Sequence, residues 1–390
     1  MLIWQIIFWF CVLCLVHSYI FYPLILNILA ASKKRPVPEI STQHQPMVSV
    51  IMSVYNEEKV LEKKIRTVFT TQYPLDKLEL VIGSDGSTDN TNTIIENFIK
   101  EGFNIQFKKF GGRSGKSNII NALIPEVKGE IYILTDANIL FDENTIPFLV
   151  RHFTDEKVGL VGANVINTGL QKEGISFQEE TYIRRENKIK YQEGLIWGTM
   201  MGAFGACYAI RAELFRVIPQ NFLMEDFYIT LGVISSKKLS ISDPEAKVYE
   251  DVSNLVQEEF KRKIRISAGN FQNLGVFYGL LKNPFSGAGF SFLSHKVLRW
   301  KGPFFLILAL IAVAFLFEQN LFYRILFFLQ LIGFISPLID KLFSSVNIHN
   351  FALRLIAYFY MMNLALLLGF IKWMKGIRTN TWNPTQRNIE

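Results

Sequence analysis

The chain has 390 residues, enough for two or three domains, and 50% of them are hydrophobic, which exceeds what a soluble enzyme of this length needs. Its formal net charge of +7 comes without a basic helix or a stacking module, so we exclude nucleic acid as a partner and assign the charge to residues that face lipid. Three cysteines, two of them in one apolar run, exclude a disulfide framework and fit a reducing compartment.

The first 32 residues contain no Asp, Glu, Lys or Arg. At about 1.5 Å per residue, a helix of this length crosses the roughly 30 Å hydrocarbon core of a membrane, and its apolar run is too long for a secretory signal. We therefore predict a retained transmembrane helix over residues 1–32 and a basic, proline-containing linker over residues 33–46. By the positive-inside bias, Lys33, Lys34 and Arg35 place the following domain in the cytoplasm.

Between residues 47 and 255, short apolar runs alternate with amphipathic segments, which is the pattern of an α/β domain with a mostly parallel sheet. Strands are expected at residues 48–54, 78–83, 131–140 and 158–165, and helices at residues 143–153 and 175–191. Residues 198–210 are rich in small side chains, which is typical of a backbone that approaches a ligand or another segment closely.

Three of the expected strands end in polar or acidic residues, at positions 55–58, 84–89 and 136–138. Ligands of open α/β sheets bind beyond the carboxyl ends of the strands. Asp136 and Asn138 therefore suit a hard divalent cation on one wall of a pocket. A simple Asp/Asn turn after a strand is the alternative interpretation.

Residues 111–117 have the sequence GGRSGKS, which suggests a phosphate-binding loop. The P-loop pattern requires a glycine where this chain has Phe110, so we reject an ATPase. Arg113 and Lys116, at the start of an expected helix, are still candidates for contacting a diphosphate.

An acidic pair, Glu225 and Asp226, is bracketed by apolar residues. Helix capping at Asp226 and a functional carboxylate are both consistent with this pattern, since perturbed carboxylates concentrate at active sites. A basic stretch follows at residues 262–266, where Arg262 and Arg265 suit either a diphosphate or a solvated helix face beside a membrane.

Six motifs in one order and spacing carry a family resemblance. They are VSVIMSVYNEE at 48–58, SDGSTD at 84–89, GKSNIIN at 115–121, TDAN at 135–138, MED at 224–226 and RKIRI at 262–266. Together they resemble the membrane-integrated family 2 glycosyltransferases of the GT-A fold, the group that contains the cellulose, chitin and hyaluronan synthases. The resemblance covers about residues 48–272 and extends to the membrane architecture.

The resemblance implies a nucleotide-sugar donor and a Mg²⁺ or Mn²⁺ cofactor, because a divalent cation and basic groups stabilise the leaving diphosphate. It assigns donor binding to Tyr55, Asn56, Glu57, Asp85, Lys116, Asp136, Arg262 and Arg265, with Asp85 at the uracil base. It assigns the metal to Asp136 and Asn138, and catalysis to Asp226 as the general base with Glu225 beside it. One displacement with one base inverts the anomeric centre, so an α-linked donor gives a β-linkage.

Two positions differ from the family pattern. The family usually has Asp-x-Asp where this chain has Asp136, Ala137 and Asn138, and an amide is a weaker ligand for a hard cation. The larger processive synthases carry a tryptophan after the second arginine, whereas this chain has Ile266 and lacks that aromatic platform for the acceptor sugar.

The last third of the chain is predicted to associate with the membrane. Residues 256–300 are expected to form an Arg-rich segment and amphipathic interfacial helices, residues 301–375 about three transmembrane segments (303–317, 325–339 and 355–371), and residues 376–390 a tail. If all three segments cross, the C-terminus lies outside, but Lys372, Lys375, Arg378 and Arg387 favour the inside, a conflict that one re-entrant segment would reconcile. Residues 382–387 resemble the cytoplasmic tails of related enzymes.

These observations predict an integral, multi-pass cell membrane protein that transfers a hexose or N-acetylhexosamine, by inversion, from a UDP-sugar to a membrane-associated saccharide acceptor. The acceptor is either a growing polysaccharide or a lipid-linked glycan. Two alternatives are a polyprenyl-phosphate sugar transferase, which the Arg262 and Arg265 pair argues against, and an inactive nucleotide-sugar-binding membrane regulator, which Asp226 argues against. The sequence does not identify the sugar, the linkage or the oligomeric state.

Overall fold

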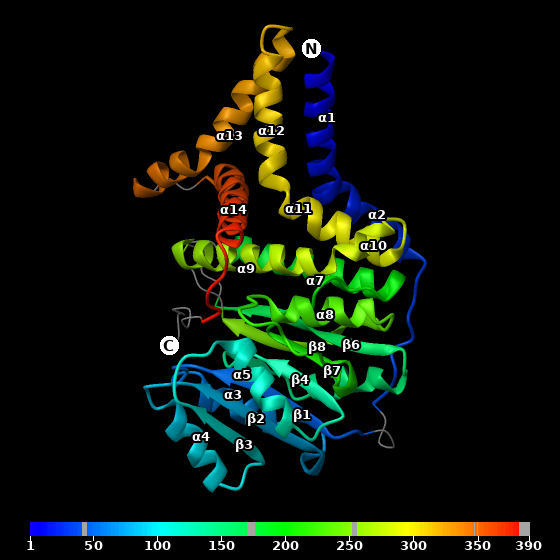
Figure 1. Ribbon diagram of the computed structural model, residues 1–390, viewed down its shortest axis with the longest axis vertical. Coiled ribbons are helices and arrows are strands. Elements are labelled where there is room, and N and C mark those ends of the chain that lie inside the picture. Colours follow the sequence, from blue (N-terminus) through cyan, green and yellow to red (C-terminus); the bar gives the residue numbers. More distant parts are fainter. Residues whose placement is uncertain (41–44, 170–175, 252–255, 347, 349, 382–390) are drawn as a thin grey trace.

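The computed structural model describes residues 1–40, 45–169, 176–251, 256–346, 348 and 350–381. Figure 1 shows an α/β domain at one end, a layer of helices across its upper face and a group of long helices beyond that layer. The predicted helix start at residue 175 and the tail sequence at residues 382–387 lie outside the described residues.

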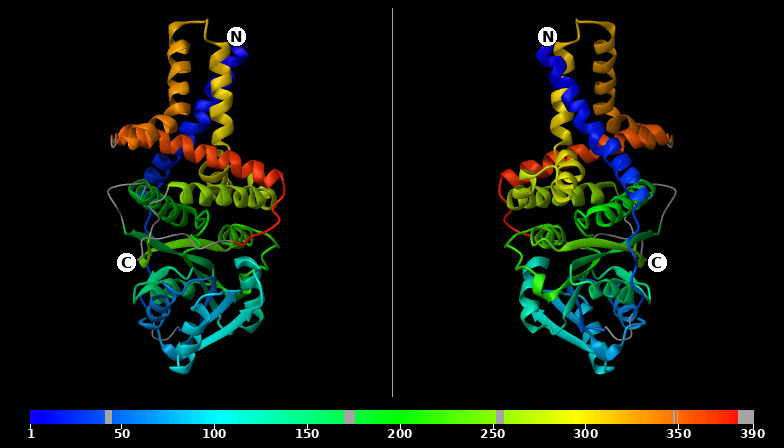
Figure 2. Two further views of the ribbon diagram at one scale, coloured as in Figure 1. Left: turned by 90° about the vertical axis from the view of Figure 1, so that its left-hand side faces the viewer. Right: turned by 90° about the vertical axis from the view of Figure 1, so that its right-hand side faces the viewer.

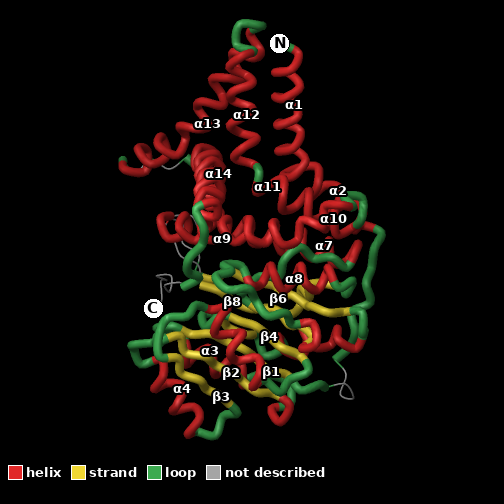
Figure 3. The backbone as a smooth tube through the Cα atoms, viewed as in Figure 1, coloured by secondary structure: helices red, strands yellow, loops and turns green. Residues whose placement is uncertain are grey.

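Eight strands form one mixed sheet in the order β3-β2-β1-β4-β7-β6-β8-β5, drawn as the yellow strands in Figure 3. Their bounds are β1 Val48–Val54, β2 Leu78–Asp85, β3 Ile105–Phe110, β4 Ile131–Thr135, β5 Ile139–Phe141, β6 Val158–Thr168, β7 Cys207–Arg211 and β8 Leu239–Asp251. The pairs β1–β2, β1–β4, β2–β3 and β6–β8 are parallel, whereas β7 and β5 pair antiparallel with their neighbours. The predicted α/β class with a mostly parallel sheet is therefore confirmed.

The strand expected at residues 131–140 is in fact two strands. The chain leaves β4 at Asp136, and after a short turn Ile139 starts β5, which pairs with β8 at the edge of the sheet. The polar turn between them, which includes Asn138, thus carries the chain from the middle of the sheet to its margin.

Helices cover both faces of the sheet, which explains why successive residues of β1 are buried on either face. All seven residues of β1 are buried. Val50 and Met52 belong to the core cluster that contains Ile65 of α3 (Leu61–Phe69), while Ile51 between them belongs to the cluster that contains Ile120 of α5 (Lys116–Leu123). The other helices of this domain are α4 (Thr91–Lys100), α6 (Thr145–Val150) and α8 (Glu225–Ser235).

The middle layer contains α7 (Ser176–Trp197) and α9 (Val256–Phe277), which cross the upper face of the α/β domain in Figure 1. Three short segments continue it: α10 (Gly287–Ser291), the π-helical turn η7 (Phe292–Val297) and α11 (Leu298–Trp300). This layer separates the sheet from the long apolar helices.

Three described helices are long and apolar enough to cross a membrane: residues Leu2–Ala31, α13 (Leu321–Ser345) and α14 (Phe351–Met374). The first consists of α1 (Leu2–Val16), a π-helical turn (His17–Phe21) and α2 (Tyr22–Ala31). The segments Gly287–Trp300 and Gly302–Phe315 (α12) form a pair bent by 61°, which would make a fourth candidate if it acts as one span. Figure 2 shows α1 and α12 standing side by side.

Helix α14 meets the length test for a span, yet Figure 2 shows it lying crosswise to α1 and α12, along α9. Packing accounts for this direction, because the hydroxyl of Ser267 in α9 donates to the carbonyl of Leu366 at 2.8 Å, and Gly369 lies directly against Ser267. The chain then returns to the α/β domain, where Asn380 contacts Gly115. Asn380 therefore lies on the same side of the long helices as the sheet.

This arrangement predicts the accessibility of single cysteines. In sealed vesicles we expect Lys100→Cys and Arg378→Cys to react with an impermeant maleimide from one side, and Glu318→Cys, between α12 and α13, from the other. All three native positions are exposed, and the native cysteines are buried, so background labelling should be low. Labelling of Arg378→Cys from the side that labels Glu318→Cys would contradict the arrangement.

Candidate active site

A cavity of about 330 Å³ lies at the carboxyl ends of β1 and β4, between the sheet and the middle helical layer. The predicted site residues that line it are Glu57, Lys116, Asp136, Asn138, Glu225, Asp226, Arg262 and Arg265. Its far wall comes from the middle layer and includes Lys190, Lys296, Arg299 and Trp300. Motifs that are far apart in the sequence therefore share one cavity.

Lys116 joins three of these motifs. Its Nζ lies 2.6 Å from Oδ1 of Asp136 and 2.6 Å from Oε1 of Glu225. Burial alone would lower the pKa of Lys116, but the two carboxylates raise it well above its usual value. The side chain is thus a fixed cation at the point where α5 begins, β4 ends and α8 begins.

Asp226 lies in the first turn of α8 and is 7% exposed. Its Oδ1 accepts the N–H of Phe227 at 2.7 Å, but the N-cap of α8 is Met224, so Asp226 is not the capping residue. Burial, together with adjacent Glu225, raises the pKa of Asp226 to about 6, against the opposing effect of Lys116. A carboxyl group of that pKa can accept a proton at neutral pH.

The donor atoms around Asp136 fit a hard divalent cation only in part. The Asp136 side chain is 40% exposed and lines the cavity with Asn138, whose Nδ2 lies 3.5 Å from Oε1 of Glu250. Within the described residues, no three His, Cys, Asp or Glu side chains come together as a metal site. Asp136 and Asn138 supply oxygen ligands that suit Mg²⁺ or Mn²⁺, and such an ion would complete its shell with phosphate oxygens and water.

Three predicted donor-binding residues, Tyr55, Asn56 and Asp85, do not line the cavity. Asn56 Oδ1 accepts the N–H of Thr88 at 2.9 Å, whereas Tyr55 and Asp85 contact the glycine-rich turn. Asp85 is completely buried and accepts the N–H of Gly115 at 3.0 Å and Nε of Arg113 at 3.2 Å. The guanidinium of Arg113 lies 3.4 Å from the centre of the Tyr55 ring. In this structure Asp85 supports the backbone before Lys116, and its contact with a uracil base stays a prediction.

The two arginines of the basic stretch have different surroundings. Arg262 donates to both carboxylate oxygens of Glu259, at 2.8 and 3.0 Å, and lies 3.6 Å from Glu179. Among the described residues, Arg265 forms no ion pair, and it lines the cavity. Of the two, Arg265 is therefore the cation that is available to a bound anion.

Sequence reasoning missed several lining residues, among them Lys190 and Asn380. Lys190 is 5% exposed, and its Nζ lies 3.0 Å above the ring centre of Phe204. Burial and the nearby charge of Lys296 lower the pKa of Lys190 to about 7. Neither residue belongs to a sequence motif. Tertiary packing brings them to the cavity, Lys190 on α7 in the middle helical layer and Asn380 on the segment that follows α14.

Residues 49–218 match the family model described as Glycosyl transferase family 2. The poly-beta-1,6-N-acetyl-D-glucosamine synthase of Staphylococcus epidermidis is 28% identical over 128 residues, which are 32% of this chain and 30% of that protein. The probable glycosyltransferase YdaM of Bacillus subtilis is 30% identical over 120 residues, which are 30% of this chain and 29% of that protein. The alignments thus span less than a third of these curated relatives.

A structure of the mannosyltransferase PcManGT from Pyrobaculum calidifontis, in complex with GDP-Man and Mn²⁺, superposes with a TM-score of 0.71 at 18% identity, covering 95% of this chain and 99% of that one. This likeness extends the shared fold beyond the aligned domain to the helical layers. Residues 49–218 therefore form a Glycosyl transferase family 2 domain, on a GT-A-like mixed α/β sheet with apolar helices at both ends of the chain.

Proposed function

We propose that this protein is a membrane-bound inverting glycosyltransferase, which transfers a sugar from a nucleotide-sugar donor to a membrane-associated saccharide. The observation that carries the proposal is the meeting of Lys116, Asp136 and Glu225 beside Asp226 in one cavity. The three apolar helices support a membrane location. The match to a synthase of N-acetylglucosamine polymer supports UDP-N-acetylhexosamine or a UDP-hexose as the donor class.

The leaving diphosphate gains negative charge as the glycosidic bond breaks. Lys116 and Arg265 are the cationic side chains placed to bind it, and Asp136 and Asn138 would hold the divalent cation. When bound, that cation supplies Lewis-acid stabilisation of the diphosphate. Lys116 also keeps Asp136 oriented toward the cavity, because it bridges Asp136 to Glu225.

The acceptor hydroxyl needs a base, because it is a poor nucleophile at neutral pH. Asp226 accepts its proton while the hydroxyl oxygen forms a bond to the anomeric carbon and the diphosphate leaves with the bonding electrons. Attack from the face opposite the diphosphate inverts that carbon. The burial of Asp226 keeps it free of competing water and ready to accept the proton.

The direct test is nucleotide release by the purified full chain in lipid nanodiscs, measured with UDP-glucose, UDP-galactose, UDP-N-acetylglucosamine, UDP-N-acetylgalactosamine and GDP-mannose, each with Mg²⁺ or Mn²⁺. We expect release from at least one UDP-sugar, increased by a saccharide acceptor. Binding of the nucleotides without release from any donor would support a binding-only regulator instead.

Substitution of Asp226 tests its assignment as the general base most directly. Asp226→Asn keeps the shape of the side chain but removes its capacity to accept a proton, so we expect transfer to fall by about 10²–10⁴-fold. Binding of UDP, measured by calorimetry, should stay within about twofold of wild type, since the donor contacts are unchanged. Wild-type turnover by this variant would show that another group is the base.

The raised pKa of Asp226 predicts a pH dependence. The carboxyl group is protonated below about pH 6 and cannot then accept a proton, so kcat/KM should rise through pH 6 and level off above it. Below the pKa the fall should approach about tenfold per pH unit. UDP binding measured over the same range separates this effect from loss of the donor site, and a flat profile from pH 5 to 8 would contradict the assignment.

The metal ligands are tested by adding charge. Asn138→Asp replaces an amide with a carboxylate, so we expect the Mn²⁺ concentration for half-maximal activity to fall several-fold, since cation affinity rises with the number of charged ligands. Asn164→Asp, on β6 outside the cavity, is the matched control and should leave that concentration unchanged. Equal behaviour of the two variants would remove Asn138 from the metal site, and activity that survives chelation would remove the metal itself.

A further inference from the structure

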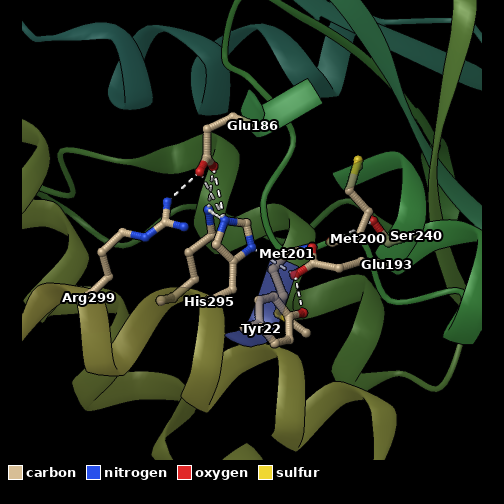
Figure 4. Close-up of polar contacts among 9 residues, drawn as sticks. Tyr22, Glu186, Glu193, Met200, Met201, Ser240, His295 and Arg299 are labelled. Atoms are coloured by element: carbon tan, nitrogen blue, oxygen red, sulfur yellow. Dashed lines mark hydrogen bonds and ion pairs between the residues drawn. The ribbon is translucent and has the colours of Figure 1, made fainter. Parts of the chain in front are cut away.

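A network of buried charged side chains begins in the far wall of the cavity, which Glu186, Lys296 and Arg299 line, and Figure 4 shows its polar contacts. At its centre is Glu193 of α7, which is completely buried. Its Oε1 accepts hydrogen bonds from the hydroxyl of Tyr22 and from Nδ1 of His295, both at 2.7 Å. Its Oε2 accepts the backbone N–H of Met201 at 2.9 Å. One carboxylate therefore connects the N-terminal apolar helix, η7 and the segment after α7.

His295 lies between the two buried carboxylates of α7, Glu193 and Glu186. Its ring is completely buried, with Nδ1 facing Glu193 and Nε2 lying 3.1 Å from Oε2 of Glu186. Nε2 also lies 3.2 Å from Nζ of Lys296, so the imidazole ring lies among Glu193, Glu186 and Lys296. Lys296 and Arg299 also donate to Glu186, which completes a paired network.

The Met201 N–H belongs to a segment that we name the acceptor-facing loop, residues 199–206, between α7 and β7. Four of its backbone N–H groups donate to residues outside the loop: Thr199 to the carbonyl of Glu193 at 3.4 Å, Met200 to the carbonyl of Ser240 at 2.9 Å, Met201 to the Glu193 carboxylate at 2.9 Å and Ala203 to the hydroxyl of Thr230 at 3.0 Å. Residues 201–206 line the cavity.

This loop lies directly against the base. A Cβ atom added at Gly205 would lie 3.0 Å from Oδ2 of Asp226, so a side chain there would crowd the carboxylate. Thr230, which holds Ala203, also donates its hydroxyl to the carbonyl of Asp226 at 2.7 Å. The loop and the base thus share one set of hydrogen bonds, and a shift of the loop changes the space in front of Asp226.

We infer that Glu193 is a positioning residue, which with His295 and Tyr22 holds the acceptor-facing loop against Asp226 and so determines how the acceptor binds. The inference rests on the proposed transfer function. Lys116, in the proposed donor site, forms its ion pairs with Asp136 and Glu225 and not with this network, so we expect acceptor use to respond more strongly than donor binding. A carboxylate is required because one oxygen serves Tyr22 and His295 while the other serves Met201, and an amide offers only one accepting oxygen.

The variant Glu193→Gln tests the positioning role of Glu193, because it removes the carboxylate with little change in side-chain volume. With UDP-N-acetylglucosamine as donor and an N-acetylglucosamine tetramer as the acceptor probe, we expect the acceptor KM to rise about tenfold or more and kcat to fall, since small displacements at a reacting centre have large effects. The affinity for UDP with Mn²⁺ should stay within about twofold. If Glu193→Gln does not fold, Tyr22→Phe is the second variant. It removes the hydrogen bond from Tyr22 to Glu193 and should raise the acceptor KM by a smaller factor.

Asp243→Asn is the matched control. Asp243 is also a buried carboxylate that accepts from a histidine, an arginine and a backbone N–H, namely those of His152, Arg151 and Glu245, but it does not line the cavity. We expect this variant to lose stability as Glu193→Gln does, without a change in acceptor KM.

Hydrogen exchange gives a readout that does not depend on turnover. Peptides covering residues 200–203 should exchange faster in Glu193→Gln than in wild type or Asp243→Asn. Unchanged exchange there, or an acceptor KM that rises no more than the donor KM, would overturn the inference. If wild-type protein releases no nucleotide from any donor, the proposed function fails, while the exchange experiment still decides whether Glu193 positions the loop.

Discussion

One ammonium group between two carboxylates fixes the geometry of the site. A buried charge is costly unless an opposite charge accompanies it, so Lys116 and Glu225 are buried as a pair, and half-exposed Asp136 is the second partner of Lys116. This requirement brings the start of α5, the end of β4 and the start of α8 to one point. Asp226 follows Glu225 in the first turn of α8, so the ion pair between Lys116 and Glu225 also fixes the position of Asp226 in the cavity. Asp85 holds the backbone that delivers Lys116.

The same rule shapes the helical layer between the sheet and the long helices. Arg262 and Glu259 pair within α9, and the charge of Glu186 is balanced by Lys296 of η7 and Arg299 of α11. These pairs make the wall of the cavity polar on the side that faces the apolar helices. A cavity of this kind suits a ligand with phosphates and hydroxyl groups, and Glu193 connects its wall to the N-terminal helix.

The long helices show why composition alone does not give a topology. Helix α14 is as apolar as a spanning helix, yet it lies along α9, where Gly369 allows close approach to Ser267. A side chain larger than hydrogen at Gly369 would collide with Ser267, so this glycine allows α14 to pack closely on α9. Because α14 lies crosswise, the chain returns to the α/β domain, and Asn380 reaches the cavity. Residues 375–381 thus lie on the same side of the long helices as the sheet, which agrees in direction with the basic residues after α14.

The sequence by itself determined the class of the sheet and the bounds of β1, since apolar periodicity and turn residues are local properties, whereas the family resemblance predicted which motifs share one site. It did not distinguish Arg262, which is paired, from Arg265, or show that Asp85 lies beneath the cavity. The partners of Glu193 were decided by the tertiary structure alone. His295 is 102 residues away in the chain, and ion pairing depends on which surfaces meet, a property that no local pattern encodes.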